Sequence, residues 1–457
     1  MITEGPVTTD YLDALARFAC ETRFEDIPEN VIEHCKLILS DTLAVIAAGM
    51  QEKEMQAFAA RHLPKVAPGQ AWVIGTGQRA NALDAALLNA AAGVWLELDE
   101  GHFHTNGHPG IHVIPAALAC AQENGLSGKD LLSAIVLGYE VCGRVGGAYR
   151  MRVVVQTHGT FGVIGATVGA GRLSGLSPAE MRQAINIAAS TPLGGNRQTM
   201  LDGATIRNYY PAHAAFTGQI AVRLVQSGFT GPFDAPSVTF GKILADDFSP
   251  ERAVAGLGSR WLILENYIKL YPSARYVHGA IDALLDALAK APGKKLAPGS
   301  VERVEVRGYH MLVFCGEKRP KSMFGTRFST PFSLATILHH GRADLDVFGE
   351  AALANPVVLD LAARVDMIEV PEFNEGFPAR KPCRLRIVLK DGSSYEGSCD
   401  VPKGEIGNPH APAEIERKYY QLATPVWGER RARGLRELCM RLEAVPDMRD
   451  VAQTMAL

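Results

Sequence analysis

The chain carries, at residues 161–175, the segment FGVIGATVGAGRLSG, in which small residues recur at helical spacings. Gly162, Ala166, Gly169 and Ala170 lie close together around one helix, and small side chains let a neighbouring helix approach closely. A nucleotide-binding loop would instead require a GxGxxG or GxxxxGK motif after a strand, and no such motif occurs. The segment therefore predicts a tightly packed helix inside a helical domain.

The sequence on both sides of this segment is also patterned as helix, up to about residue 260. A long helix is predicted through VIEHCKLILSDTLAVIAAG (31–49), which ends at a glycine. Ser127 with Asp130, and Ser177 with Glu180, have the spacing of capping boxes, in which side chains satisfy the free amides of a first helical turn. The N-terminal half is therefore predicted to be all helical.

Composition and charge place the chain among globular proteins of two or three domains. Its 457 residues are 47% hydrophobic and 21% charged, and the net charge of −3 offers no basic surface for a nucleic acid or an anionic membrane. No apolar run approaches the ~20 residues of a membrane span, and the start, MITEGPVTTDYLDAL, does not resemble a leader peptide. Eight cysteines without a CxxC motif indicate reduced core thiols. We expect a cytoplasmic protein with no nucleic-acid or membrane partner.

The pattern changes after about residue 297, where strands alternate with helix. One stretch alternates apolar and charged residues, VERVEVRGY (301–309), and another predicts a hairpin with a turn at Asp391-Gly392, CRLRIVLKDGSSYEGSC (383–399). A helix is predicted between them, and helical periodicity returns after Pro412. The sequence therefore predicts a mainly α protein, in which a smaller α+β domain (266–404) is inserted into a large helical domain (1–265 plus 405–457).

Titratable side chains are densest in residues 97–115, ELDEGHFHTNGHPGIHVIP, which hold three carboxylates and four histidines and lead into the apolar run AALACA. Carboxylates are costly to desolvate and gather where they are solvated, paired, bound to metal or used in proton transfer. Imidazole is the side chain best suited to proton transfer near neutral pH. This segment is therefore the first candidate for an active site.

Several further motifs follow one another in a specific order. They are DTLAVIAAG, ELDEG with GHPGIHVIPAALA, THGTFGVIGATVGAG, TIRNYYPAHAAFTG with GFTGP, KLYPSARYVHGAIDAL, FSTPFSLATIL and PKGEIGNP. In this order and spacing the chain resembles the MmgE/PrpD family over essentially its full length. That family contains 2-methylcitrate dehydratase, cis-aconitate decarboxylase and iminodisuccinate epimerase.

The resemblance implies a large all-helical domain with a small α+β lid domain, the inserted residues 266–404. It also implies a homodimer that acts on small di- or tricarboxylates by carbanion-like chemistry, without a metal or an organic cofactor. Two positions depart from the family pattern. Residues 97–100 are Glu-Leu-Asp-Glu where the better-known members have Asp-x-Asp-Asp, and Arg207 stands where the decarboxylase and the epimerase have lysine. Because arginine stays protonated and grips a carboxylate bidentately, Arg207 suits substrate binding better than proton transfer.

Removing a proton or carbon dioxide from carbon beside a carboxylate builds negative charge, so such a site needs fixed cations together with a base. Residues in the family motifs supply both. The predicted catalytic residues are His108, His158, Lys269 and Asp99. The predicted substrate-binding residues are Arg207, Arg275, His278 and Glu97.

Each of these residues also has a structural interpretation. His108, between a glycine and a proline, could cap a helix, and His158 or His278 could pack in the core. The two arginines could pair with core carboxylates, and Asp99 could serve in an ion pair alone.

His102, His104 and His108, with Asp99 or Glu100, also suggest a metal site. Their spacing is not the helical HExxH pattern, and His102 and His104 lie on a glycine-flanked loop, so we predict no metal. The predicted function is a cofactor-independent lyase, a dehydratase of the 2-methylcitrate dehydratase kind or a decarboxylase, acting between the two domains. The closest alternative is an epimerase that uses the same proton abstraction. A metallohydrolase and a non-catalytic carboxylate binder are further alternatives.

Overall fold

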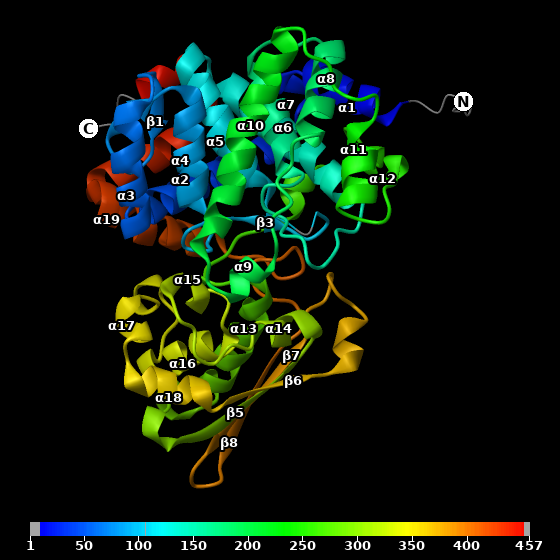
Figure 1. Cartoon of the computed structure of the whole chain (residues 1–457). Coiled ribbons are helices and arrows are strands. Elements are labelled where there is room, and N and C mark those ends of the chain that lie inside the picture. Colours follow the sequence, from blue (N-terminus) through cyan, green and yellow to red (C-terminus); the bar gives the residue numbers. More distant parts are fainter. Residues whose placement is uncertain (1–9, 106, 452–457) are drawn as a thin grey trace.

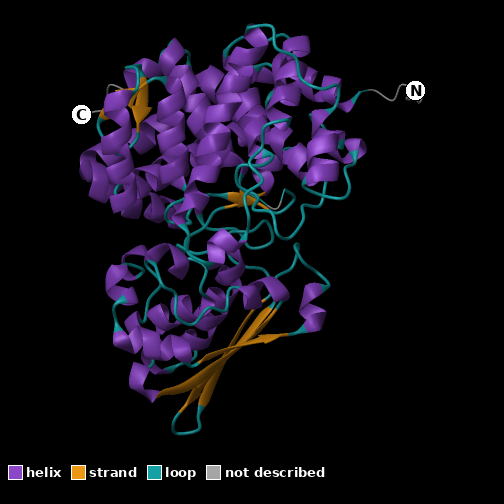
Figure 2. Cartoon of the chain, in the orientation of Figure 1, coloured by secondary structure: helices purple, strands orange, loops and turns teal. Residues whose placement is uncertain are grey.

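The computed structural model describes residues 10–105 and 107–451. Helices dominate it and strands are confined to small sheets (Figure 2), so the prediction of a mainly α protein is confirmed. Residues 1–9, which entered the prediction about a leader peptide, lie outside the described residues. Within the described residues, no helix combines the length and the apolar character needed to cross a membrane.

Most helices form one large bundle, which occupies the upper half of Figure 1. The main helices are α1 (Tyr11–Glu21), α2 (Glu29–Met50), α3 (Lys53–His62), α4 (Ala82–Gly93), α5 (Pro109–Asn124), α6 (Gly128–Gly147), α7 (Gly162–Leu173), α8 (Pro178–Ala189) and α10 (Tyr209–Gln226). Shorter elements are α9 (Gln198–Leu201), α11 (Ala235–Val238), α12 (Pro250–Val254) and the antiparallel pair β1 (Ala71–Val73) and β2 (Gln78–Ala80). The predicted capping boxes open α6 and α8, which confirms both helix starts.

The last long helix, α19 (Pro412–Cys439), returns from the C-terminal end of the chain to pack against α2. It is two helical segments joined at Gly428, where φ is 72°. A residue in this left-handed region interrupts a right-handed helix, and glycine adopts it without steric cost. The bundle is therefore built from both ends of the chain.

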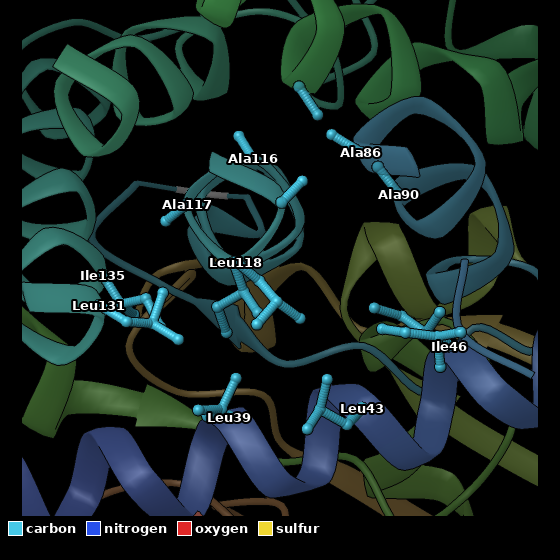
Figure 3. Packing of buried hydrophobic residues seen from close by; sticks show 14 of the residues in the cluster. Leu39, Leu43, Ile46, Ala86, Ala90, Ala116, Ala117, Leu118, Leu131 and Ile135 are labelled. Atoms are coloured by element: carbon cyan, nitrogen blue, oxygen red, sulfur yellow. The ribbon is translucent and has the colours of Figure 1, made fainter. Parts of the chain in front are cut away.

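Helix α5 runs through the middle of the bundle, and every residue from Pro109 to Gln122 is buried. Figure 3 shows its side chains among those of α2, α4 and α6: Ala116, Ala117 and Leu118 of α5 lie close to Leu39, Leu43, Ile46, Ala86, Ala90, Leu131 and Ile135. Since α5 begins directly after His108, this packed core also determines where His108 lies.

The small residues of α7 allow the close helix packing that the sequence predicts. A Cβ atom on Gly165 would lie 2.6 Å from Val113 Cγ2 of α5 and 2.7 Å from Cys142 Sγ of α6. A Cβ atom on Gly162 would lie 2.2 Å from the ring of His112. These distances are shorter than van der Waals contact, so a larger residue would force the helices apart.

The lower half of Figure 1 is the α+β part, whose four-stranded sheet has the order β6-β5-β7-β8. The strands are β5 (Val301–Gly308), β6 (Val365–Glu369), β7 (Cys383–Leu389) and β8 (Ser394–Cys399). The predicted hairpin is confirmed, because β7 and β8 pair antiparallel and Gly392 turns with a φ of 85°. Strand β6 pairs in parallel with β5 and was not predicted, because this edge strand is largely exposed and lacks an apolar alternation.

Helices cover this sheet and complete a separate core. Helix α13 (Arg275–Ala289) packs on β7 and β8. The other helices are α14 (His310–Phe314), α15 (Met323–Thr326), α16 (Thr330–His340), α17 (Glu350–Leu353) and α18 (Pro356–Ala363). The core consists of residues between Ala274 and Cys399 together with Met200. A short antiparallel pair, β3 (Gly101–His102) with β4 (Asn266–Tyr267), lies between the two parts (Figure 1).

Candidate active site

A small cavity of about 50 Å³ lies where the helical part meets the α+β part. Its charged, histidine and amide side chains come from segments far apart in the sequence: Glu97, His102, His108, Gln156, His158, Arg197, Arg207, Arg275 and Lys381. Four of these are arginine or lysine and one is a carboxylate. This excess of positive charge, enclosed in a protein interior, favours an anionic ligand.

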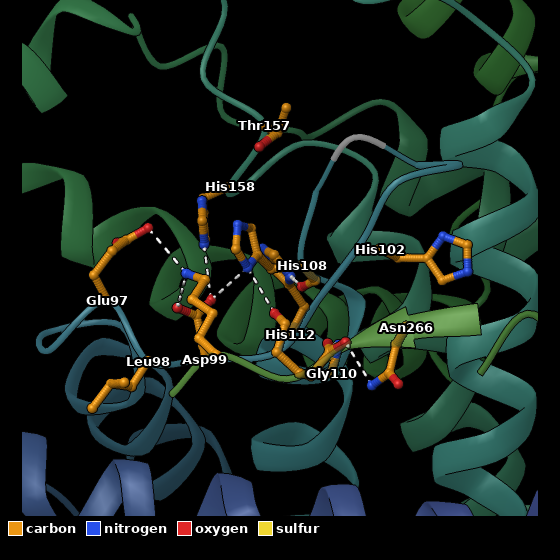
Figure 4. Close-up of polar contacts among 12 residues, drawn as sticks. Glu97, Leu98, Asp99, His102, His108, Gly110, His112, Thr157, His158 and Asn266 are labelled. Atoms are coloured by element: carbon orange, nitrogen blue, oxygen red, sulfur yellow. Dashed lines mark hydrogen bonds and ion pairs between the residues drawn. The ribbon is translucent and has the colours of Figure 1, made fainter. Parts of the chain in front are cut away.

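Asp99 joins two histidines beside the cavity (Figure 4). Its Oδ2 atom lies 2.9 Å from His108 Nδ1 and 3.4 Å from His158 Nε2. The two imidazole rings stack with their centroids 4.4 Å apart. Asp99 and His158 are buried, and His108 is 11% exposed. One carboxylate therefore orients both rings, an arrangement used in proton transfer.

These contacts assign the protons on the two rings. His108 Nδ1 also lies 2.7 Å from the carbonyl oxygen of Glu100, so Nδ1 carries hydrogen. His108 Nε2 has no hydrogen-bond partner among the described residues, and neither does His158 Nδ1. Burial holds the pKa of His158 well below its usual value, and Arg207 and His108 add to the effect. Burial opposes ionisation of Asp99, but His108 and Lys269 hold its pKa well below the usual value, so it is a carboxylate.

Two buried cations meet Glu97 next to this group. Lys269 Nζ lies 3.2 Å from Glu97 Oε1 and 3.3 Å from Asp99 Oδ1. Arg207 Nη2 lies 2.8 Å from Glu97 Oε2. Although Arg207 is only 1% exposed, its Nε and Nη1 atoms have no partner among the described residues. Unpaired buried donors are costly, and an oxygen anion could satisfy both of these atoms.

The backbone between Glu97 and Asp99 is held in place by side chains of α2 and α19. Glu97 has a φ of 54°, a value that non-glycine residues rarely adopt. The neighbouring carbonyl of Leu98 accepts a hydrogen bond of 2.9 Å from Lys418 Nζ, which also lies 2.7 Å from Asp41 Oδ2. Helices α2 and α19 thus keep Glu97 and Asp99 in place, and strained backbone of this kind is typical of functional sites.

Arg275 enters the cavity wall from the start of α13. Its guanidinium donates to the carbonyl of Lys403 over 2.9 Å and lies 3.1 Å from Glu405 Oε1. It also donates over 2.9 Å to His278 Nδ1, while His278 Nε2 donates to the carbonyl of Ser273. Both nitrogens of His278 are therefore occupied, and burial holds its pKa well below the usual value. His278 supports Arg275 and is not among the residues that line the cavity.

Two other titratable residues of the segment 97–115, Glu100 and His102, are held by hydrogen bonds. Glu100 accepts hydrogen bonds from Gly110 N, Tyr139 Oη and Asn266 Nδ2. His102 donates from Nε2 to the carbonyl of Leu262 and accepts from the amide of His104. In Figure 4 His102 points away from the Asp99 group. The metal site suggested by His102 and His104 is therefore not assembled in the described structure.

A different group, Asp99, His108 and His158, has the composition of a metal site, since its ligand atoms lie within 4.8 Å of one another. Contacts within the protein already account for this geometry, because His158 Nε2 hydrogen-bonds to Asp99 and His108 Nδ1 lies 2.9 Å from the same carboxylate oxygen. Lys269, 3.3 Å from Asp99, would repel a divalent cation at this place. Contacts within the protein therefore explain the geometry of this group without a metal ion.

The eight predicted site residues lie close together, some lining the cavity and the others directly behind its wall. Five line the cavity, namely Glu97, His108, His158, Arg207 and Arg275. The other three lie behind that wall: Asp99 and Lys269 contact His108 and Glu97, and His278 contacts Arg275.

Three charged or amide residues of the cavity are not among the predicted site residues: Arg197, Lys381 and Gln156. Lys381 is 1% exposed, donates over 2.6 Å to the carbonyl of Pro378 and lies 3.5 Å from Glu405 Oε1. Burial lowers its pKa to about 7, although Glu405 opposes the change. A lysine just before a predicted strand gives no sign of burial, so no sequence signal could have found it. Gln156 directly precedes the THGT motif, and that proximity is a signal that could have been used.

Two family models match the amino-acid sequence, one in each half of the chain. The MmgE/PrpD N-terminal domain matches residues 13–249, and the MmgE/PrpD C-terminal domain matches residues 271–444. The chain belongs to the MmgE/PrpD family. This confirms the family resemblance seen in the motifs, and the cavity lies where the two MmgE/PrpD domains meet.

Curated MmgE/PrpD relatives align over nearly the whole chain. Cis-aconitate decarboxylase of Aspergillus terreus is 28% identical over 463 residues, which cover 95% of this chain and 93% of the relative. The cis-aconitate decarboxylase-like protein oryM of Aspergillus oryzae is 26% identical, over 98% and 97% of the two chains. Human cis-aconitate decarboxylase is 24% identical, over 79% and 77%.

Proposed function

We propose that this MmgE/PrpD protein is a cofactor-independent lyase that decarboxylates or dehydrates a small tri- or dicarboxylate. The observation that carries the proposal is the enclosed cavity in which the unpaired donors of Arg207 adjoin two histidines held by one carboxylate. The names of the curated relatives make decarboxylation of cis-aconitate the first reaction to test.

In the proposed reaction, Arg207 and Arg275 bind substrate carboxylates and orient the reacting carbon. In a decarboxylation, the bond between that carbon and one carboxylate breaks, carbon dioxide leaves, and the electron pair stays on the carbon. Protonated His108 then delivers a proton from Nε2 to this carbon and regains one from water, while Asp99 steadies the ring through Nδ1. In a dehydration, neutral His108 removes the proton beside the carboxylate before hydroxide departs with the help of an acid.

We also infer that residues 266–404 act as the inserted lid domain. The separate core of the α+β part and the return of α19 to the helical bundle support this assignment. Because Arg275 and Lys381 belong to this part while Arg207 and His108 belong to the bundle, the cavity is complete only when the two parts are in contact. Closure would exclude water from the carbanion.

Proton NMR in deuterated water, with cis-aconitate, 2-methylcitrate and related acids as candidate substrates, tests the proposal. Decarboxylation gives a product that carries deuterium on the carbon that bore the lost carboxylate. Dehydration gives an alkene, seen as a new vinyl proton or, for 2-methylcitrate, as replacement of the methyl doublet by an allylic methyl singlet. Exchange of one C–H signal without net conversion would instead support the epimerase alternative. Absence of all three changes across the panel would contradict the proposed function.

Removal of metal tests the cofactor-independent part of the proposal. Because side chains supply the positive charge, we expect dialysis against a chelator to leave turnover unchanged and metal analysis to find less than one equivalent per chain. Stoichiometric metal whose removal abolishes turnover would assign Asp99, His108 and His158 to a metal site instead.

We further propose that the enzyme is a cytoplasmic homodimer. Exposed apolar side chains on two adjoining segments support self-association. Val153 and Val154 are 68% and 70% exposed, and Ile243 is 60% exposed. The two segments are joined by the hydrogen bond from Arg152 Nη1 to the Ile243 carbonyl. Burying such a patch would stabilise a dimer.

A further inference from the structure

Gln156 has a hydrogen-bond donor that no residue of the described structure satisfies. The side chain is 3% exposed and lines the cavity together with Arg207 and His158. Its Nε2 atom has no partner in residues 10–105 and 107–451. A buried amide nitrogen without an acceptor costs about 1–3 kcal/mol, so a donor kept in this state at a cavity wall indicates a ligand.

The orientation of the Gln156 amide is determined by its oxygen. Oε1 accepts a hydrogen bond of 2.7 Å from the backbone amide of Thr157 and one of 3.3 Å from the Thr157 hydroxyl. Rotating the amide by half a turn would place its NH₂ group against the Thr157 amide, which is also a donor. The backbone amide of Gln156 is anchored in turn, because it donates over 2.8 Å to the carbonyl of Gly195. The donor is therefore held in one position.

The unpaired atoms around this donor specify the ligand. Nε and Nη1 of Arg207 also lack partners and belong to the same cavity. Together these atoms present several N–H groups and one positive charge, which matches the oxygens of a carboxylate.

We propose that Gln156 is a substrate-binding residue, whose Nε2 donates to the same substrate carboxylate that Arg207 binds. The inference rests on the proposed function, because it names a residue that recognises a substrate of that class. It also explains why a neutral amide lines the same cavity as Arg207: the amide adds directional hydrogen bonding without adding charge.

Binding of tricarballylate, a saturated tricarboxylate that cannot undergo the reaction, tests the inference by isothermal titration calorimetry. Gln156→Glu keeps the oxygen that Thr157 binds but replaces the donor with an anionic oxygen. Loss of one hydrogen bond to a charged group weakens binding by about 10- to 100-fold. We expect Gln156→Glu to weaken binding at pH 7.5 by more than this. Relative to the wild type at the same pH, affinity should recover as the pH falls, because a protonated carboxyl is again a donor. Gln156→Met should weaken binding by about 10- to 100-fold with no such recovery.

Gln122 provides a matched control. It is also fully buried with an unpaired Nε2, and its Oε1 accepts from the amide of Trp72. However, it lies within α5 and does not line the cavity. Gln122→Glu should lower thermal stability and leave the affinity for tricarballylate within about two-fold of the wild type.

The outcomes separate this inference from the proposed function. Folded Gln156→Glu and Gln156→Met variants that bind tricarballylate as the wild type does would overturn the inference, even if the enzyme turns over. A wild type that does not bind tricarballylate would overturn it as well. Tight binding that depends on Gln156, without turnover of any polycarboxylate, would refute only the proposed function. If Gln156→Glu fails to fold by circular dichroism, Gln156→Met decides the question.

Discussion

Arg207 is a buried arginine of the cavity, and two of its three nitrogens have no hydrogen-bond partner in the described structure. Arg207→Lys keeps the charge but loses the two-pronged geometry, so turnover should persist while kcat/KM falls. Arg207→Ala should lower kcat/KM by the equivalent of about 2–4 kcal/mol, as for removal of one buried charged contact. Steady-state kinetics measures both effects.

Arg144 is the control for this prediction. It is 2% exposed, like Arg207, but its guanidinium donates to the carbonyls of Ala255 and Arg260 outside the cavity. Arg144→Lys should reduce stability and leave kcat/KM unchanged. Equal kinetic losses in the two variants would mean that Arg207 acts only through the stability of the fold.

We expect Lys381 to make ligand binding depend on pH. Burial lowers its pKa to about 7, and a bound carboxylate favours the charged ammonium. Below about pH 7 the ammonium is already present, so binding changes its charge little. Above about pH 7 the free side chain is neutral, so binding must take up a proton, and affinity should decrease as the pH rises. Calorimetry of tricarballylate binding at pH 8, in buffers of different ionisation enthalpy, measures this uptake.

The uptake should disappear in Lys381→Met and persist in Lys390→Met, a control at the exposed turn between β7 and β8. A wild type that binds tricarballylate at pH 8 without proton uptake would show that ligand binding does not protonate Lys381.

At the scale of elements, the packing of α7 against α5 and α6 depends on the absence of a side chain at Gly165. Because its Cβ would lie 2.6 Å from Val113 Cγ2 and 2.7 Å from Cys142 Sγ, Gly165→Ala should lower the free energy of unfolding by about 1–3 kcal/mol through overpacking. Gly434 of α19 is exposed and has no atom within 4 Å of its Cβ position. Gly434→Ala should therefore stabilise the protein by roughly 0.5–1 kcal/mol, since alanine is the better helix former. Urea unfolding of the three proteins measures both signs, and a neutral Gly165→Ala would show that α7 can move without cost.

At the scale of the whole molecule, the exposed apolar patch around Val153 and Val154 predicts a dimer in solution. Light scattering should give about twice the chain mass for the wild type. Val154→Glu should shift the equilibrium to the monomer, because it places a charge in the interface. Val357→Glu is the control, since Val357 lies on α18 of the α+β part and is 42% exposed. A dimer that survives Val154→Glu unchanged would place the interface elsewhere.

The sequence by itself determined most of the elements and the family. Local signals depend only on neighbours along the chain, so the capping boxes of α6 and α8, the long helix α2 and the hairpin β7–β8 could all be predicted. Strand β6 could not, because its parallel pairing with β5 comes from a partner about sixty residues away and its own side chains are largely exposed.

The sequence also named eight candidate site residues. Only the tertiary structure decided which of them line the cavity and which lie behind its wall. Motif membership cannot tell a residue that lines a cavity from one that supports it. Burial and contacts do, and they place His278 behind Arg275 and Asp99 behind the two histidines. Burial and contacts also bring Lys381 and Gln156 into the cavity, which the sequence did not predict. An unsatisfied donor or a depressed lysine pKa arises only when distant segments remove water and supply no partner, and that is a property of packing in three dimensions.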